Sequence, residues 1–219
     1  MPKEEGGADG AAKVAQAASS HFDREAAAYE SSSRYRRLAR PRALAVEFLR
    51  LTATDRLLDV GCGTGETLRQ LAPRVASATG VDVAPKMIEV ARRCTHELPN
   101  LEFAVAESAE LPFHDAAFTA ALCTFSFHHF PRPAASAAEI ARVLEDGGRL
   151  VLADACSDQW RIRIADVLGR RWEPGHVHFY RAEELREILE QAGFIRVTTH
   201  QASRSWYMIV TAVKAGRDL

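Results

Sequence analysis

Apolar positions along the chain fall into short runs that are separated by segments of helical spacing. The runs that predict buried strands are Leu57–Val60, a run that ends at Asp82, Leu101–Val105, Ala117–Phe125 and Arg149–Asp154. Between them, amphipathic segments at 85–96 and 133–144 predict helices. Strands and helices that alternate in this way predict an α/β protein built on a doubly wound, mostly parallel sheet.

The first fifty residues follow a different pattern. Residues 1–18 are rich in Gly, Ala, Lys and Glu, and predict a disordered tail or at best a frayed helix. Residues 19–50 predict two helices, because a helix-start signal at Ser19 precedes a strong helix former and residues 34–50 have helical spacing. We therefore expect one domain over residues 19–219.

The last part of the chain predicts one helix and two strands. The helix covers 181–192, and Gly193 ends it. The segments 194–200 and 206–214 predict strands that lie side by side and antiparallel. Before them, residues 157–180 fit neither pattern and are rich in aromatic residues, Arg and His, which is typical of a lid or substrate loop.

A glycine turn follows the first predicted strand, with the pattern Asp-x-Gly-x-Gly-x-Gly from Asp59 to Gly65. Glycine accepts positive φ and lets a ligand approach without meeting a Cβ. The third glycine comes one residue earlier than in the dinucleotide fingerprint, where Glu66 stands instead. Asp82, about 20 residues further on, is placed to meet a ribose diol. It could also cap the helix that starts at Pro85, and its two oxygens allow both roles.

Composition and charge exclude several classes of protein. The 219 residues carry a net charge of -1, which gives no general attraction to nucleic acid or to an anionic membrane. Five arginines between positions 34 and 42 fit either an RNA contact or a solvated helix face. The four cysteines are scattered, so neither a disulfide framework nor a metal site is expected. No signal peptide or membrane-spanning run is recognisable, and a cytoplasmic protein is expected.

Together, these motifs resemble those of the class I S-adenosylmethionine-dependent methyltransferases, in particular the small-molecule branch that includes quinone-biosynthesis enzymes. The segments that carry the resemblance are Leu57–Gly65, Gly80–Asp82, Ala109–Phe113, Phe127–Phe130 and Arg142–Leu150. The resemblance implies a Rossmann-like sheet of seven strands whose last strand is antiparallel. It also implies S-adenosylmethionine as the cofactor.

The resemblance assigns the cofactor-binding residues. Asp59 would meet the methionine ammonium group, the turn at Gly61 and Gly63 the carboxylate, and Asp82 the ribose. The remaining candidates are Tyr29 in a cover formed by residues 19–50, Val83 and Met87 beside the adenine, Glu107 and Ser108 near its amino group, and Cys123. The family usually has Asp at the position of Glu107. Tyr29, Val83 and Met87 could equally be packing residues.

Candidates on the acceptor side come from two segments. His128 and His129 could act as general bases or could only shape the pocket, since imidazole titrates near neutral pH. In the 157–180 lid, the substrate candidates are Trp160, Trp172, His176, His178 and Tyr180. We expect a monomer or homodimer that methylates O, N or C of a small, flat or apolar acceptor. The alternatives are a nicotinamide-dependent oxidoreductase and a regulator that binds the cofactor without catalysis.

Overall fold

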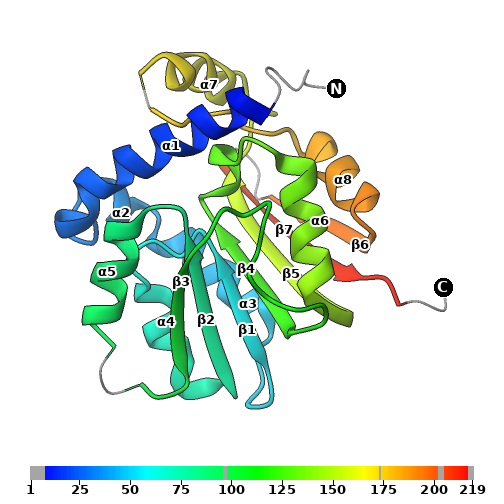
Figure 1. Ribbon diagram of the computed structural model, residues 1–219. Coiled ribbons are helices and arrows are strands. Elements are labelled where there is room, and N and C mark those ends of the chain that lie inside the picture. The colour runs from blue at the N-terminus through cyan, green and yellow to red at the C-terminus, as the bar shows by residue number, and fades with distance from the viewer. Residues whose placement is uncertain (1–7, 96–97, 173, 202–204, 217–219) are drawn as a thin grey trace.

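The computed structural model describes residues 8–95, 98–172, 174–201 and 205–216. Its centre is a seven-stranded sheet in the order β3-β2-β1-β4-β5-β7-β6 (Figure 1). The strands are β1 (Arg56–Val60), β2 (Ser77–Asp82), β3 (Leu101–Val105), β4 (Phe118–Thr124), β5 (Leu144–Ala155), β6 (Phe194–His200) and β7 (Tyr207–Lys214). Strand β7 runs antiparallel to both of its neighbours, β5 and β6, and the other neighbouring strands are parallel. The predicted fold class is confirmed.

Helices cover both faces of the sheet, because alternate strand residues point to opposite sides. In β1, Leu57 belongs to a core cluster with α3 and α4, whereas Leu58 belongs to a cluster with α6 and α8. The α-helices are α1 (Ala8–Glu25), α2 (Ser33–Arg37), α3 (Ala39–Leu49), α4 (Glu66–Leu71), α5 (Pro85–Arg93), α6 (Pro133–Val143), α7 (Trp160–Trp172) and α8 (Ala182–Gln191). Both clusters are buried, as expected for a parallel sheet covered on both faces.

Several elements differ from the sequence predictions. The helix expected over 34–50 is divided into α2 and α3. Helix α1 begins at Ala8, so residues 8–18 are helical where a disordered tail or at best a frayed helix was expected; the alanine-rich sequence favours the helix and Ala18 is buried. Helix α7 occupies much of the segment expected to be an irregular lid. Strand β5 begins at Leu144, five residues before the expected start, although its pairing with β4 is irregular there.

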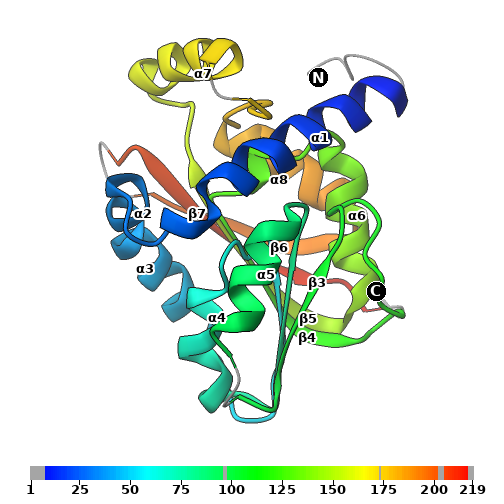
Figure 2. The same ribbon diagram turned by 60° about the vertical axis from the view of Figure 1, so that its left-hand side comes forward.

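Helix α1 lies across the edge of the sheet where β1, β2 and β4 end (Figures 1 and 2). Asp23 near its end accepts a hydrogen bond of 2.8 Å from the backbone amide of Lys86, in the first turn of α5. This bond satisfies one of the donors that a helix leaves open at its N-terminus. The fold thus fixes a cover over the carboxyl ends of the strands, where ligands bind in open α/β sheets.

Candidate functional site

A pocket lies between α1 and the carboxyl ends of β1, β2 and β4. The space between its atoms is about 670 Å³, part of which is open solvent at its mouth. Its walls are formed by Ala15, Ala18, Phe22, Tyr29, Val60, Gly61, Gly63, Val81, Asp82, Val83, Met87, Ala106, Glu107, Ser108, Phe125, Ser126, His129, Phe130 and Pro131. Most of the cofactor residues expected from the sequence therefore meet in one place.

The glycine turn is braced by the end of the neighbouring strand. The Gly63 amide donates to Asp82 Oδ2 at 2.9 Å, and the Ala84 amide donates to Asp82 Oδ1 at the same distance. Asp82 therefore holds the turn and the start of α5 together. At Gly61, with φ +79°, a Cβ would overlap the side chain of Ser126, whereas at Gly63 the nearest atom to a Cβ is Tyr29 Cε1, 3.6 Å away. Gly61 is thus required for packing against Ser126, whereas a side chain at Gly63 would extend into the pocket.

Asp59 is a buried carboxylate near the end of β1 and is not among the residues of the pocket wall. Its side chain is 2% exposed, and its Oδ1 has no hydrogen-bond partner within the described part of the chain. Burial, together with the nearby charge of Asp82, raises its pKa to about 7, although Arg42 opposes this. A buried acid of this kind is suited to a ligand that brings a cation. The methionine ammonium group fits that requirement.

A clamp that the sequence reasoning missed attaches the N-terminal cover to the glycine turn. Glu30 Oε1 accepts hydrogen bonds from Thr64 Oγ1 and Arg69 Nη2, each at 2.7 Å. The neighbouring Tyr29 forms part of the pocket wall, and burial raises the pKa of its hydroxyl. The side chain of Glu30 thus holds Tyr29 over the turn. A single Glu in a turn between two short helices gives no sequence signal for such a role.

The adenine candidates lie in the same pocket. Val83, Met87, Glu107 and Ser108 all form part of its wall. Glu107 Oε1 is held by Arg132, whose Nε and Nη2 donate to it at 3.2 and 3.0 Å. The Ser108 hydroxyl is hydrogen-bonded to that of Ser136 at 2.8 Å. Both polar side chains are therefore anchored within the protein, and Met87 is almost completely buried.

The two adjacent histidines have different environments. His128 is 3% exposed and does not line the pocket; its Nδ1 lies 2.7 Å from Asp154 Oδ1, and its backbone amide donates to Oδ2 of the same residue. His129 lines the pocket, and its Nδ1 donates to the carbonyl oxygen of Gly175 at 3.0 Å. This bond assigns the neutral tautomer in which Nε2 is an acceptor. Burial, and then the neighbouring His128, lower the pKa of His129 well below its usual value.

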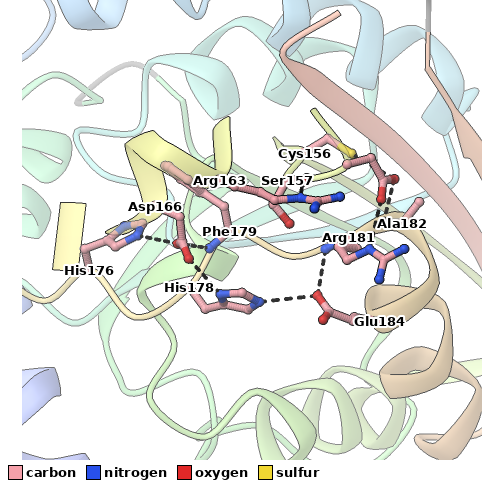
Figure 3. A network of polar contacts seen from close by, with 11 residues as sticks. Cys156, Ser157, Arg163, Asp166, His176, His178, Phe179, Arg181, Ala182 and Glu184 are labelled. Carbon is pink, nitrogen blue, oxygen red and sulfur yellow. Dashed lines mark hydrogen bonds and ion pairs between the residues drawn. The ribbon is translucent and has the colours of Figure 1, made fainter. Parts of the chain in front are cut away.

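The lid is attached to this site through a buried carboxylate (Figure 3). Asp166 of α7 accepts from His176 Nε2 at 2.9 Å and from His178 Nδ1 at 3.0 Å. The His128 carbonyl oxygen accepts from the amides of Val177 and His178. Asp166 also makes the strongest contribution to raising the pKa of His178. Within the described residues, no three His, Cys, Asp or Glu side chains are grouped as metal ligands would be. The imidazoles of His176 and His178 therefore join α7 to the segment that follows it, and neither is part of the pocket wall.

Other predicted site residues lie away from the pocket. Cys123 is fully buried in the core, and Tyr180, 2% exposed, packs against Phe127 there. Trp160 is 65% exposed on α7 and points to solvent instead of covering an acceptor. None of the three side chains is part of the pocket wall, because a strand residue can face the core and a helical residue can face outward. The side chain of Trp172 lies outside the described residues.

Comparisons with known proteins agree with this geometry. A family model described as a methyltransferase domain matches residues 29–199. A demethylmenaquinone methyltransferase of Tropheryma whipplei is 30% identical over 195 residues, 79% of this chain and 81% of that protein. An O-methyltransferase of Penicillium expansum is 38% identical over 144 residues, 64% of this chain and 52% of that protein. The chain thus spans about half the length of the Penicillium relative.

A solved structure shows the same fold. The crystal structure of the YcgJ protein of Bacillus subtilis superposes with a TM-score of 0.70 at 22% identity, over 80% of this chain and 97% of that one. Among the described residues, no helix combines the length and apolar character needed to cross a bilayer. Because the family model matches most of this chain, the chain belongs to the class I S-adenosylmethionine-dependent methyltransferases.

Proposed function

We propose that the protein transfers the methyl group of S-adenosylmethionine to a nucleophilic atom of a small aromatic or otherwise apolar acceptor. The observation that carries this proposal is the buried Asp59 carboxylate, which interacts electrostatically with Asp82 and whose Oδ1 has no hydrogen-bond partner within the described residues. The two acids match two groups of the cofactor: Asp59 suits the ammonium and Asp82 the ribose hydroxyls. The bound cofactor supplies a methyl group on a positively charged sulfur.

The chain's own residues would bind, orient and exclude water. Helix α1 brings Phe22 to the pocket, and the turn that follows it brings Tyr29; the Phe22 ring meets His129 edge-on with centroids 5.1 Å apart. An acceptor placed beside His129 would therefore lie in an apolar, covered space. Holding the two reactants in line is the main contribution available, since it can supply roughly 7–11 kcal/mol of the barrier.

The environment of His129 bears on proton removal. Its lowered pKa keeps the imidazole neutral at physiological pH, so that Nε2 can accept a hydrogen bond from an acceptor hydroxyl. The same low pKa makes it a poor proton acceptor, because transfer is most effective when the base has a pKa near the working pH. His129 therefore orients the acceptor, and the acceptor's own acidity sets how easily the proton leaves.

The acceptor class is drawn from the relatives. One is named an O-methyltransferase and another a demethylmenaquinone methyltransferase, so phenols and quinols are the first compounds to test. The experiment is transfer of labelled methyl from S-adenosylmethionine to a panel of such compounds, after calorimetry with S-adenosylhomocysteine. Binding of S-adenosylhomocysteine with methylation of a panel member supports the proposal. Binding of NADH instead would favour the oxidoreductase. Cofactor binding without transfer to any O, N or C acceptor would favour the regulator.

A further inference from the structure

Helix α7 presents an apolar stripe to solvent. Trp160, Ile164, Val167 and Leu168 are 65, 52, 68 and 50% exposed, and they account for most of the large apolar side chains exposed to this degree in the described part of the chain. Their spacing of three and four residues places them on one side of the helix. In both views α7 lies at the outer edge of the molecule, beyond α1 (Figures 1 and 2).

The opposite side of α7 is fixed to the protein, so the stripe cannot turn inward without breaking buried contacts. Asp166 holds His176 and His178, as Figure 3 shows. Gly169 packs against the His176 ring, where a Cβ would come within 2.9 Å of Cδ2. Arg163 Nε donates to the Ser157 carbonyl oxygen at 2.9 Å. The outward direction of the stripe is therefore built into the fold.

Positive charge accompanies the stripe. Arg161 and Arg163 are exposed and, by helical spacing, lie on its two flanks, and Arg171 is exposed at its C-terminal end. The single acid of the helix, Asp166, is buried on the inner side. An apolar stripe bordered by arginines, with a Trp at one end, is the pattern of a helix that lies in the plane of an anionic lipid interface.

Other occupants of this surface are less well matched. The terminal segment 1–7 has the sequence Met-Pro-Lys-Glu-Glu-Gly-Gly, which offers too few apolar side chains to cover the stripe. A second copy packed isologously through α7 would bring the same arginines face to face, with no exposed acid on the helix to pair with them. An anionic lipid surface satisfies both the apolar stripe and its basic border.

We propose that α7 docks the protein peripherally on anionic lipid membranes, through Trp160, Ile164, Val167 and Leu168 together with the flanking arginines. The inference concerns a surface outside the cofactor pocket and does not depend on the identity of the acceptor. It revises the expectation from the net charge of -1, which averages this basic border with acids elsewhere in the chain. It requires no membrane-spanning segment.

The test is co-flotation of the full chain with vesicles of phosphatidylcholine alone or phosphatidylcholine mixed with phosphatidylglycerol. We expect binding to the mixed vesicles that weakens as salt is added. Ile164→Ser/Val167→Ser should reduce the partition coefficient at least tenfold. Arg161→Gln/Arg171→Gln should reduce it by about fivefold per arginine, the scale for a basic residue near an anionic surface.

A matched control lies at the far edge of the sheet, where Val105 of β3 is 48% exposed. Val105→Ser should leave vesicle binding unchanged, and all variants should keep the wild-type unfolding temperature and S-adenosylhomocysteine affinity. Equal loss of binding with Val105→Ser, or no binding of wild type to the mixed vesicles, overturns the proposal. So does a concentration-dependent dimer in sedimentation that Ile164→Ser/Val167→Ser abolishes, because the stripe would then be a contact between copies.

Discussion

The Gly63 amide donates a hydrogen bond to the Asp82 carboxylate, across 2.9 Å between the turn after β1 and the tip of β2. The other oxygen of Asp82 accepts from Ala84. One side chain is thus a brace for the protein and, in our proposal, a ligand for the ribose. Burial raises the pKa of this carboxyl, and the two amides oppose that effect.

Replacement of Asp82 should separate these two roles. Asp82→Ala leaves two amides unpaired and should lower the free energy of unfolding by about 1–3 kcal/mol. Asp82→Asn keeps one acceptor oxygen, so its free energy of unfolding should be closer to that of wild type. Both should weaken S-adenosylhomocysteine binding by roughly tenfold or more, the scale of a charge-assisted hydrogen bond. Calorimetry and chemical denaturation measure the two effects; wild-type affinity in Asp82→Asn would remove the carboxylate charge from the site.

Two glycines of the turn should respond differently to alanine. Gly61→Ala forces a Cβ into Ser126, so we expect a loss of folding stability of about 1–3 kcal/mol. The Cβ of Gly63→Ala meets no close protein atom, so this variant should lose only about 1 kcal/mol of folding stability, because of the positive φ. The methyl group at Gly63 instead enters the pocket and should weaken cofactor binding. Thermal unfolding compared with ligand affinity tests the contrast, and the opposite ranking would contradict it.

Asp59 predicts a pH dependence of stability. Its folded-state pKa of about 7 lies above the ordinary value of 3.8, so the ligand-free folded state binds the proton more tightly than the unfolded chain. The resulting stabilisation is complete below pH 3.8 and is lost as the pH rises through 7. The free energy of unfolding of Asp59→Asn should therefore exceed that of wild type by about 2–4 kcal/mol at pH 8, and by less at pH 5. Denaturation at the two pH values measures this.

The same carboxyl predicts the pH dependence of binding. A cationic ammonium prefers ionised Asp59, so S-adenosylhomocysteine affinity should rise by up to about tenfold per pH unit between pH 5 and 7. The Asp59→Asn variant should bind more weakly and with little pH dependence over this range. A wild-type affinity that is constant from pH 5 to 7 would separate Asp59 from the ammonium.

The neighbouring histidines should give distinct phenotypes. His128→Ala removes a buried partner of Asp154 and should lower stability by about 2 kcal/mol. His129→Ala should chiefly lower turnover, with cofactor affinity changed less than tenfold. Since the pKa of His129 is far below neutrality, wild-type turnover should not fall through a histidine titration between pH 6.5 and 8. A pH–rate profile with a His129-dependent inflection near pH 7 would identify a general base instead.

Loosening the cover should speed release of the cofactor. Glu30→Gln weakens the contacts with Thr64 and Arg69, and we expect the dissociation rate of S-adenosylhomocysteine to rise by roughly three- to tenfold, the scale of a hydrogen bond to a charged group. Stopped-flow competition measures the rate. Glu47→Gln, an exposed acid on α3, is the matched control. Equal dissociation rates in the two variants would show that the clamp does not gate release.

The sequence was most informative where local chemistry determines structure. The alternating segment Leu101–Val105 is β3 with the same bounds, and the glycines between Asp59 and Gly65 form the turn beside the pocket. A strand covered on both faces requires a run of apolar residues, and a positive φ favours glycine, so both can be recognised in the sequence. The antiparallel placement of β7 came from family resemblance and is confirmed by its register with β5.

What the sequence could not give was the direction in which side chains face. The spacing of Trp160, Ile164 and Val167 is helical, yet only tertiary packing decides that their side of α7 is the exposed one. In the same way, Tyr180 looked like a lid aromatic and is a core residue. Glu30 and Asp166 were missed because each acts through partners far away in the chain or in a segment that was expected to be irregular.

The position of β7 inside the sheet has a consequence for how the molecule assembles. In the described sheet, β6 pairs with β7 and reaches β5 only through it, so β6 cannot join the sheet in chain order. The β5–β7 pairing must close a loop that contains α7, α8 and β6, and such long-range closure is slow. We therefore expect the parallel half of the sheet to become protected from hydrogen exchange before β6, whose pairing has to wait for a strand that lies further along the chain.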